Sequence, residues 1–220
     1  MTIHCNICGS TDFASFRNRP AERCTSCDSL ARHRVVAEAY SLLLSEGAEV
    51  LHLAPEPCIY PLLAKRFSEG YRTADAAPER YAHAPAESMR LPDDLGRFAD
   101  GTFDAILHNH VLEHIPGHYG DWLPPFLRWL KPGGRMIFTI PGPYDLAQTK
   151  EGGENLATDA ERLEHFLQED HFRLFGREFE PWLAALEGGE LEPDPVSDDR
   201  RAELGVRPGK GRVFVWRRAT

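Results

Sequence analysis

Short apolar runs alternate with stretches of helical periodicity along most of the chain. Residues 135–141 (RMIFTIP) are apolar almost throughout, which is typical of a strand buried on both faces of a parallel sheet. The other strand-like runs are residues 49–54, 71–76, 86–92, 102–110, 190–196 and 211–218. Helical patterns cover residues 29–47, 57–70, 119–134 and 177–189. Strands that alternate with helices predict an α/β fold with a doubly wound, mostly parallel seven-stranded sheet.

Local signals predict where several helices begin and end. Ser29 is a candidate cap for the first helix. Pro61 is compatible with the second helix only in its first turn, where no backbone N–H is needed. Gly133 is expected to end the helix of residues 119–134. Thr158 begins a capping-box pattern that opens a further helix.

The composition is that of an ordinary globular protein with an acidic balance. The 220 residues carry a net charge of −9, with 42% hydrophobic and 27% charged residues. This length allows one α/β domain and a small appendage. Broad nucleic-acid binding is disfavoured, because it needs clustered Lys and Arg. The apolar runs are far below membrane-spanning length and no leader-like segment opens the chain, which predicts a cytoplasmic protein without a membrane anchor.

Charge is distributed unevenly along the sequence. Residues 1–35 carry five Arg against three acids, and residues 207–220 carry five basic residues and no acid. Residues 187–203 hold seven acids against two Arg. Solvated surface charge is the simplest interpretation, and a basic patch near the amino terminus is the alternative.

Four of the five cysteines form two Cys-x-x-Cys pairs, Cys5 with Cys8 and Cys24 with Cys27. Fifteen residues separate the pairs, a spacing typical of structural zinc sites. Two such turns complete a closed tetrahedral shell of four sulfurs, which leaves no open coordination position. Zinc suits a redox-inert site of this kind, and iron is the main competitor. The pattern predicts a zinc knuckle over residues 1–29, followed by the α/β domain over residues 30–220.

Ligands of doubly wound sheets bind at the carboxyl ends of the strands. Four segments there resemble class I S-adenosylmethionine-dependent methyltransferases of the small type that carries a Leu-Glu-His-Ile stretch. The segments are YRTADAAP (71–78), AESMRLPDD (86–94), FDAILHNHVLEHIP (103–116) and LKPGGRMIFTIP (130–141). The resemblance covers about residues 48–143, and an amino-terminal cysteine knuckle also occurs on some members of the family. It implies a Rossmann-like methyltransferase fold.

The resemblance implies a set of ligands for S-adenosylmethionine. Asp75 takes the position of the ribose ligand, and Glu87 takes that of the acid facing the adenine amino group. His108, Asn109 and His110 are placed on the floor of the site, near the methionine part and the transferable methyl. The remaining implied cofactor-binding residues are Leu53, Ala54, Glu56, Ala76, Ser88 and Met89.

The stretch VLHLAPEPC (50–58) departs from the family pattern, which has an acidic residue and then a Gly-x-Gly-x-Gly loop. His52 stands at the acidic position, Ala54 at the first glycine and Glu56 at the second. Glycine serves in such loops because backbone must pass close to the ligand. We expect Ala54 to fit there, and Glu56 either to meet a positive charge of the cofactor or to face solvent.

Methyl transfer requires alignment of the nucleophile and, for a hydroxyl acceptor, removal of its proton. Histidine is the natural base near neutral pH, and His110, His114 and His171 are the candidates. The sequence predicts a methyltransferase acting on a small-molecule or sugar acceptor.

Two other functions compete with this one. The absent glycines favour a non-catalytic adaptor that keeps the fold and whose zinc knuckle binds a protein or nucleic acid. A nicotinamide-dependent oxidoreductase ranks last, because it needs a glycine-rich pyrophosphate turn after the first strand.

Overall fold

A seven-stranded sheet forms the centre of the computed structural model, which describes residues 3–142, 145–207 and 209–220. The strand order is β5-β4-β3-β6-β7-β9-β8, and all neighbours are parallel except that β9 runs antiparallel to β7 and β8. The strands are β3 (Val50–Leu53), β4 (Tyr71–Asp75), β5 (Glu87–Ser88), β6 (Phe103–Asn109), β7 (Leu130–Thr139), β8 (Gly189–Glu192) and β9 (Phe214–Arg218). The predicted doubly wound, mostly parallel seven-stranded sheet is confirmed.

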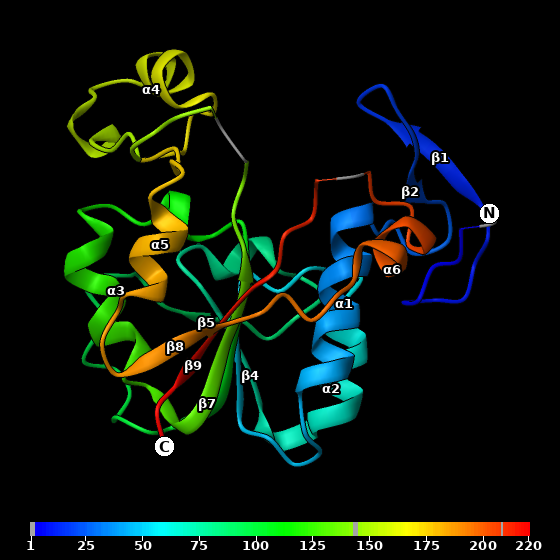
Figure 1. Cartoon of the computed structure of the whole chain (residues 1–220), viewed down its shortest axis with the longest axis horizontal. Coiled ribbons are helices and arrows are strands. Elements are labelled where there is room, and N and C mark those ends of the chain that lie inside the picture. Colours follow the sequence, from blue (N-terminus) through cyan, green and yellow to red (C-terminus); the bar gives the residue numbers. More distant parts are fainter. Residues whose placement is uncertain (1–2, 143–144, 208) are drawn as a thin grey trace.

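Helices cover both faces of this sheet (Figure 1). The α-helices are α1 (Ala31–Leu43), α2 (Tyr60–Phe67), α3 (Tyr119–Leu127), α4 (Asp159–Phe166), α5 (Phe179–Ala184) and α6 (Asp198–Glu203). Short 3-10 helices are η1 (Ser68–Gly70), η2 (Pro78–Arg80), η3 (Leu112–His114) and η4 (Gly153–Asn155). Alternate residues of β7 serve the two cores, since Ile137 packs with α1 and α2 while Met136 and Phe138 pack with α3 and α5.

Two helix boundaries follow the sequence signals and two do not. Pro61 lies in the first turn of α2, and Thr158 closes a capping box with Glu161 at the start of α4. Leu30 rather than Ser29 caps α1, because the Ser29 hydroxyl lies 3.3 Å from the Cys5 sulfur.

Gly133 does not end the helix of residues 119–134 as expected. The helix stops at Leu127, and Gly133 lies within β7 at φ +76°. The neighbouring Gly134 packs closely on β6, where an added Cβ would stand 3.0 Å from the Asp104 carbonyl oxygen. The glycines therefore allow β7 to pair closely with β6. The helical pattern of residues 119–134 did not indicate this pairing.

The amino-terminal segment forms a separate two-stranded antiparallel sheet of β1 (Phe13–Phe16) and β2 (Arg19–Cys24). The buried Arg34 of α1 ties it to the rest of the molecule. Its Nε donates to the Leu204 carbonyl at 2.8 Å, and its Nη1 donates to the carbonyls of Glu22 and Ser29 at 3.2 Å each. The division of the chain near residue 29 stays a prediction. Among the helices of the described segments, none is long and apolar enough to cross a membrane.

Candidate active site

A cleft of about 1330 Å³ opens at the carboxyl ends of β3 and β4. We call it the strand-end cleft. Of the residues that the sequence assigned to the cofactor or to catalysis, it brings together Leu53, Ala54, Asp75, Ala76, Met89, His110 and His114. These residues come from four separate segments, and the strand order brings them to one edge of the sheet.

Ala54 adopts the backbone conformation that glycine usually provides. Its φ is +51°, in the left-handed region, and its N–H donates to the carbonyl of Ala74 at 3.0 Å. An L-residue pays roughly 1–2 kcal/mol to adopt this conformation, whereas glycine adopts it freely. The turn after β3 therefore keeps a glycine-like geometry at Ala54 without a glycine.

Asp75 lies at the tip of β4 on the cleft wall, and both of its carboxylate oxygens have local partners. Oδ1 accepts from the Ala77 N–H at 2.7 Å, and Oδ2 accepts from the Tyr81 hydroxyl at 3.0 Å. These contacts orient the carboxylate beside the cleft. Each oxygen keeps a lone pair, so Asp75 can accept further hydrogen bonds from a ligand.

Glu56 does not face solvent. Its Oε2 lies 3.0 Å from Nε2 of the buried His52, and its Oε1 accepts from Asn109 Nδ2 at 2.8 Å. Burial alone would raise the pKa of Glu56, but the His52 hydrogen bond and charge lower it to about 2. Asn109 also donates to the Tyr40 hydroxyl at 2.9 Å and accepts from Thr139 at 3.1 Å. Glu56 and Asn109 thus belong to a polar network behind the cleft wall.

Three other predicted residues do not line the strand-end cleft. Glu87 on β5 is held by Arg72 Nη2 at 2.9 Å and Arg97 Nη2 at 2.7 Å, and the Ser88 carbonyl accepts from Arg97 Nη1 at 2.7 Å. His108 is fully buried, with its ring centroid 4.9 Å from that of Phe138, and neither nitrogen has a hydrogen-bond partner among the described residues. Burial lowers the pKa of His108 to about 3, so this ring is neutral. The cofactor roles of these residues stay predictions.

The three candidate bases lie near one another around η3. His110 has a φ of +55°, with its Nδ1 3.5 Å from Oε1 of the buried Glu113. His114 Nε2 lies 3.9 Å from the same oxygen, and the rings of His114 and His171 lie 4.8 Å apart. His171 is buried and His114 is about one third exposed. The ligand atoms of Glu113, His114 and His171 all lie within 4.8 Å of one another.

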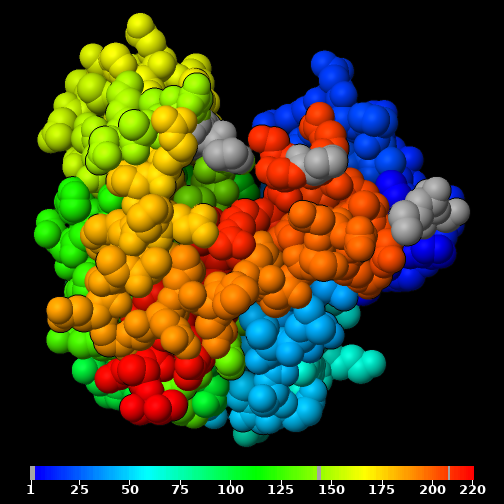
Figure 2. All heavy atoms as spheres, in the orientation of Figure 1, coloured from blue at the N-terminus to red at the C-terminus, as the bar shows by residue number. Residues whose placement is uncertain are grey.

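A second cavity, of about 570 Å³, lies beside the strand-end cleft. We call it the basic cavity, because its lining holds two acids and six basic residues, namely Arg19, Arg32, Arg177, Arg207, Lys210 and Arg212. The surface is hollowed between the lobe of α4 and the carboxyl-terminal segment (Figure 2). Among the described residues, His110 alone lines both hollows.

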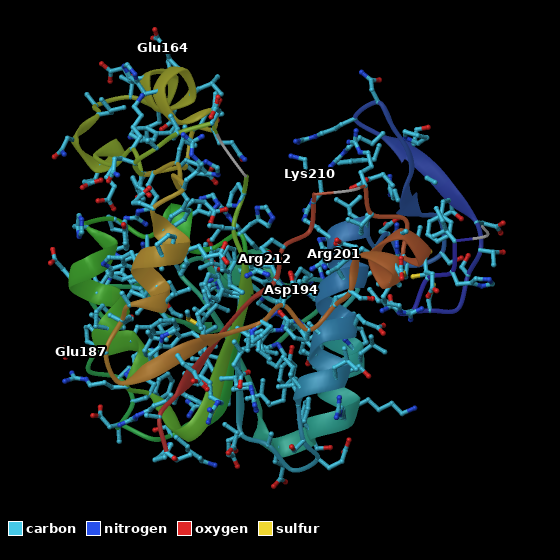
Figure 3. All side chains as sticks on the ribbon, in the orientation of Figure 1. Glu164, Glu187, Asp194, Arg201, Lys210 and Arg212 are labelled. Carbon is cyan, nitrogen blue, oxygen red and sulfur yellow. The ribbon has the colours of Figure 1, made fainter. Side chains whose placement is uncertain are left out.

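A buried ion pair fixes the segment that carries Lys210 and Arg212 (Figure 3). Arg201 of α6 pairs with Asp194 and donates from Nε to the Gly211 carbonyl at 3.3 Å. Asp194 also accepts from the Val213 N–H at 2.9 Å. These contacts fix the segment in place, so Lys210 and Arg212 line a cavity whose wall is held by defined contacts.

The four paired cysteines form one cluster, with all sulfurs within 4.8 Å of one another. Cys5 and Cys27 sulfurs lie 3.6 Å apart, as do those of Cys8 and Cys24. Each pair ends in a turn with left-handed backbone, at Gly9 (φ +80°) and at Asp28 (φ +59°). Asp tolerates this conformation better than most residues, which explains how the second turn forms without glycine.

Comparison with known proteins identifies the family. A methyltransferase-domain family model matches residues 27–186, so the chain belongs to that family. No curated protein matches the sequence. A methyltransferase from Mesorhizobium loti superposes with a TM-score of 0.53 at 17% identity, covering 84% of this chain and 98% of the other. One from Archaeoglobus fulgidus gives a TM-score of 0.54 at 10% identity, covering 88% and 96%.

Both solved structures are described as S-adenosylmethionine-dependent methyltransferases. At these identities the superpositions establish the fold, while the family match establishes the enzyme class. The chain is therefore a methyltransferase, and its fold is similar to that of the two S-adenosylmethionine-dependent enzymes. The family match argues against the adaptor, whose main support was the missing glycines.

Proposed function

We propose that the protein transfers a methyl group from S-adenosylmethionine in the strand-end cleft to an anionic small molecule or sugar in the basic cavity. The observation that carries this proposal is the position of His110, which lines both hollows. A donor and an acceptor held on its two sides would meet beside an imidazole. When bound, the cofactor supplies a methyl carbon already activated by the sulfonium.

The residues of the cleft suit this donor. Asp75 offers lone pairs at the position where the family binds the ribose, and Leu53 and Met89 offer apolar surface for the adenine. Ala54 has the backbone conformation that the missing glycine would adopt, so the chain there can lie close to the ligand. In this arrangement Glu56 acts indirectly, by holding His52 and Asn109 behind the cleft.

Replacing Asp75 by alanine tests the donor site. Loss of hydrogen bonds to a charged acceptor costs about 1.5–3 kcal/mol each, so we expect S-adenosylmethionine to bind roughly 10- to 150-fold more weakly. Isothermal titration calorimetry measures the change. Tyr81→Phe is the matched control, because it removes a local partner of Asp75 and keeps the carboxylate. Unchanged affinity in Asp75→Ala would refute the assignment of the ribose site.

The charge of the basic cavity supports an anionic acceptor. Glu22 pairs with Arg19 at 3.2 Å, and Glu180 pairs with Arg212 at 2.6 Å. Across the described ranges, Arg32, Arg207 and Lys210 make no ion pair with the protein, although all three line the cavity. Burial lowers the pKa of Arg32, which reflects the cost of holding this cation away from water. In a chain of net charge −9, cations gathered without counterions favour a carboxylate, phosphate or sulfate.

Reversing the charge of Lys210 tests the acceptor class. The protein is incubated with a cell metabolite extract and S-adenosylmethionine labelled in its methyl group, and products are separated by anion exchange. We expect label in the anionic fraction, and a roughly tenfold or greater loss at limiting extract in Lys210→Glu, because an attractive contact becomes repulsive. Lys65→Glu, at the end of α2 outside the cavity, is the control. Label found only in neutral or cationic products would overturn the anionic class.

The cysteine cluster suits a structural zinc ion. A tetrahedral site with Zn–S bonds of about 2.3 Å has sulfurs about 3.8 Å apart. Two pairs of sulfurs lie at 3.6 Å, and the Cys27 thiol donates to the Ser29 hydroxyl oxygen at 3.2 Å. Cys5, Cys8, Cys24 and Cys27 would fill all four positions and leave none for catalysis. Zinc is preferred over iron because nothing in a closed four-sulfur shell requires redox chemistry.

A further inference from the structure

The buried carboxylate of Glu113 has no hydrogen-bond partner among the described residues, and its ion-pair contacts are two histidine nitrogens at 3.5 and 3.9 Å. Its side chain is 1% exposed, and neither oxygen has a hydrogen-bond donor within the described structure. Arg173, the buried guanidinium near η3, pairs with Glu151 and donates to the carbonyls of Leu112 and Gly117. A carboxylate removed from water without a partner is costly, and such groups are paired or coordinate metals.

Two imidazoles lie near this carboxylate, and each has its Nδ1 bonded to a backbone carbonyl. His114 Nδ1 donates to the Asp170 carbonyl at 2.9 Å, and His171 Nδ1 donates to the Phe166 carbonyl at 3.2 Å. In a neutral ring this arrangement leaves Nε2 as an electron-pair donor. Backbone carbonyls hold metal-binding histidines in the same way, fixing both the tautomer and the ring.

We propose that Glu113, His114 and His171 bind a divalent transition-metal cation at the edge of the strand-end cleft. The three ligand atoms lie within 4.8 Å of one another, and His114 Nε2 is 3.9 Å from Glu113 Oε1. Two neutral imidazoles and one carboxylate are a donor set for zinc, iron, manganese or cobalt. The cation would give the buried Glu113 carboxylate a direct partner. It is distinct from the ion of the cysteine cluster, which offers only sulfur.

The position of this site gives the cation a role in acceptor chemistry. Three protein ligands leave coordination positions open, and His114 is one third exposed on the cleft wall. A bound metal lowers the pKa of an oxygen that it coordinates. An acceptor that extends from the basic cavity past His110 would bring its hydroxyl to the cation and give the proton to His110, whose Nδ1 is 3.5 Å from Glu113. Its oxygen would then form a bond to the methyl carbon as the carbon–sulfur bond breaks. This role rests on the proposed function, whereas cation binding does not.

Titration of the protein with Mn²⁺, followed by electron paramagnetic resonance of the free ion, tests the site directly. Mn²⁺ favours oxygen and nitrogen over thiolate, so the cysteine cluster does not obscure the result. We expect one Mn²⁺ site per chain in the wild type, and at least tenfold weaker binding in Glu113→Gln and in His171→Asn. His165→Asn, in α4, is the matched control and should bind as the wild type does.

A second measurement separates ligation from a purely structural role. Mn²⁺ should raise the Tm of the wild type and of His165→Asn, because a ligand that binds only the folded state stabilises it. It should leave the Tm of Glu113→Gln unchanged. Absence of a Mn²⁺ site in the wild type, or equal binding by Glu113→Gln, would overturn the proposal. Asp75→Ala should still bind Mn²⁺ after losing S-adenosylmethionine, so failure of the donor assignment remains distinguishable.

Discussion

Replacing His110 by alanine is expected to lower the rate of methyl transfer about 10²- to 10⁴-fold, the usual contribution of a positioned acid or base. His110 lines both the strand-end cleft and the basic cavity. Its N–H donates to the Thr139 carbonyl at 3.0 Å, which fixes the unusual φ of +55° at this residue. Residues held in sparsely populated backbone conformations often occur at functional sites, and the side chain here lines both the strand-end cleft and the basic cavity.

The measurement is the transfer of labelled methyl groups to the anionic product fraction at saturating S-adenosylmethionine. Calorimetry with S-adenosylmethionine should give nearly the wild-type affinity for His110→Ala, since the side chain acts on the acceptor. His165→Ala should retain full activity, because this histidine lies outside both hollows. A His110→Ala enzyme of undiminished rate would remove His110 from the chemistry and leave His114 and His171 as candidates.

The fold was predictable because its signals are local. Alternating strands and helices follow from period and length alone, and the capping box at Thr158 fixed a helix start. The predicted helix end at Gly133 was wrong, because glycine occurs both after the last turn of helices and where two backbones approach closely. The predicted helix cap at Ser29 was wrong for a different reason: its hydroxyl contacts the sulfurs of Cys5 and Cys27 instead of the helix N-terminus.

The site was predictable only in part, because its geometry depends on contacts between distant segments. Asp75, Met89 and His110 reach the cleft since strand ends of a parallel sheet meet at one edge. The inward turn of Glu56 toward His52 depends on a side-chain pairing that sequence spacing does not reveal. Nor does spacing show that His108 points into the aromatic core instead of the cleft.

The sequence shows two basic stretches, but it does not show that they lie together in the fold. The basic stretches at residues 1–35 and 207–220 are far apart in the chain, and solvated surface charge was the simpler interpretation. Arg19 and Arg32 from the first stretch and Lys210 from the second line the same cavity. Arg34 holds the amino-terminal segment against the rest of the molecule, and the Asp194–Arg201 pair holds the carboxyl-terminal one. Neither contact can be read from sequence spacing.

Replacing Cys24 by serine is expected to abolish metal binding at the cysteine cluster and to destabilise the protein by several kcal/mol. The two-stranded sheet of β1 and β2 is too small to supply a core of its own, so a zinc ion bound by the cysteines would provide much of its folding energy. Unfolding followed by circular dichroism and elemental analysis for zinc measure both effects. Cys58→Ser is the matched control, because Cys58 lies outside the cluster.

The same variant should separate acceptor binding from donor binding. Arg19 and Glu22 of β2 line the basic cavity, while most of the strand-end cleft is built by segments that follow the strands of the sheet, by α4 and by the residues after α4. Loss of the ion should therefore reduce methyl transfer to the anionic fraction strongly and leave S-adenosylmethionine binding within severalfold of the wild type. If Cys24→Ser kept the wild-type Tm and transfer rate, the cluster would neither stabilise the protein nor support the wall of the basic cavity. Iron in place of zinc would be recognised by its visible absorption and would leave the structural role unchanged.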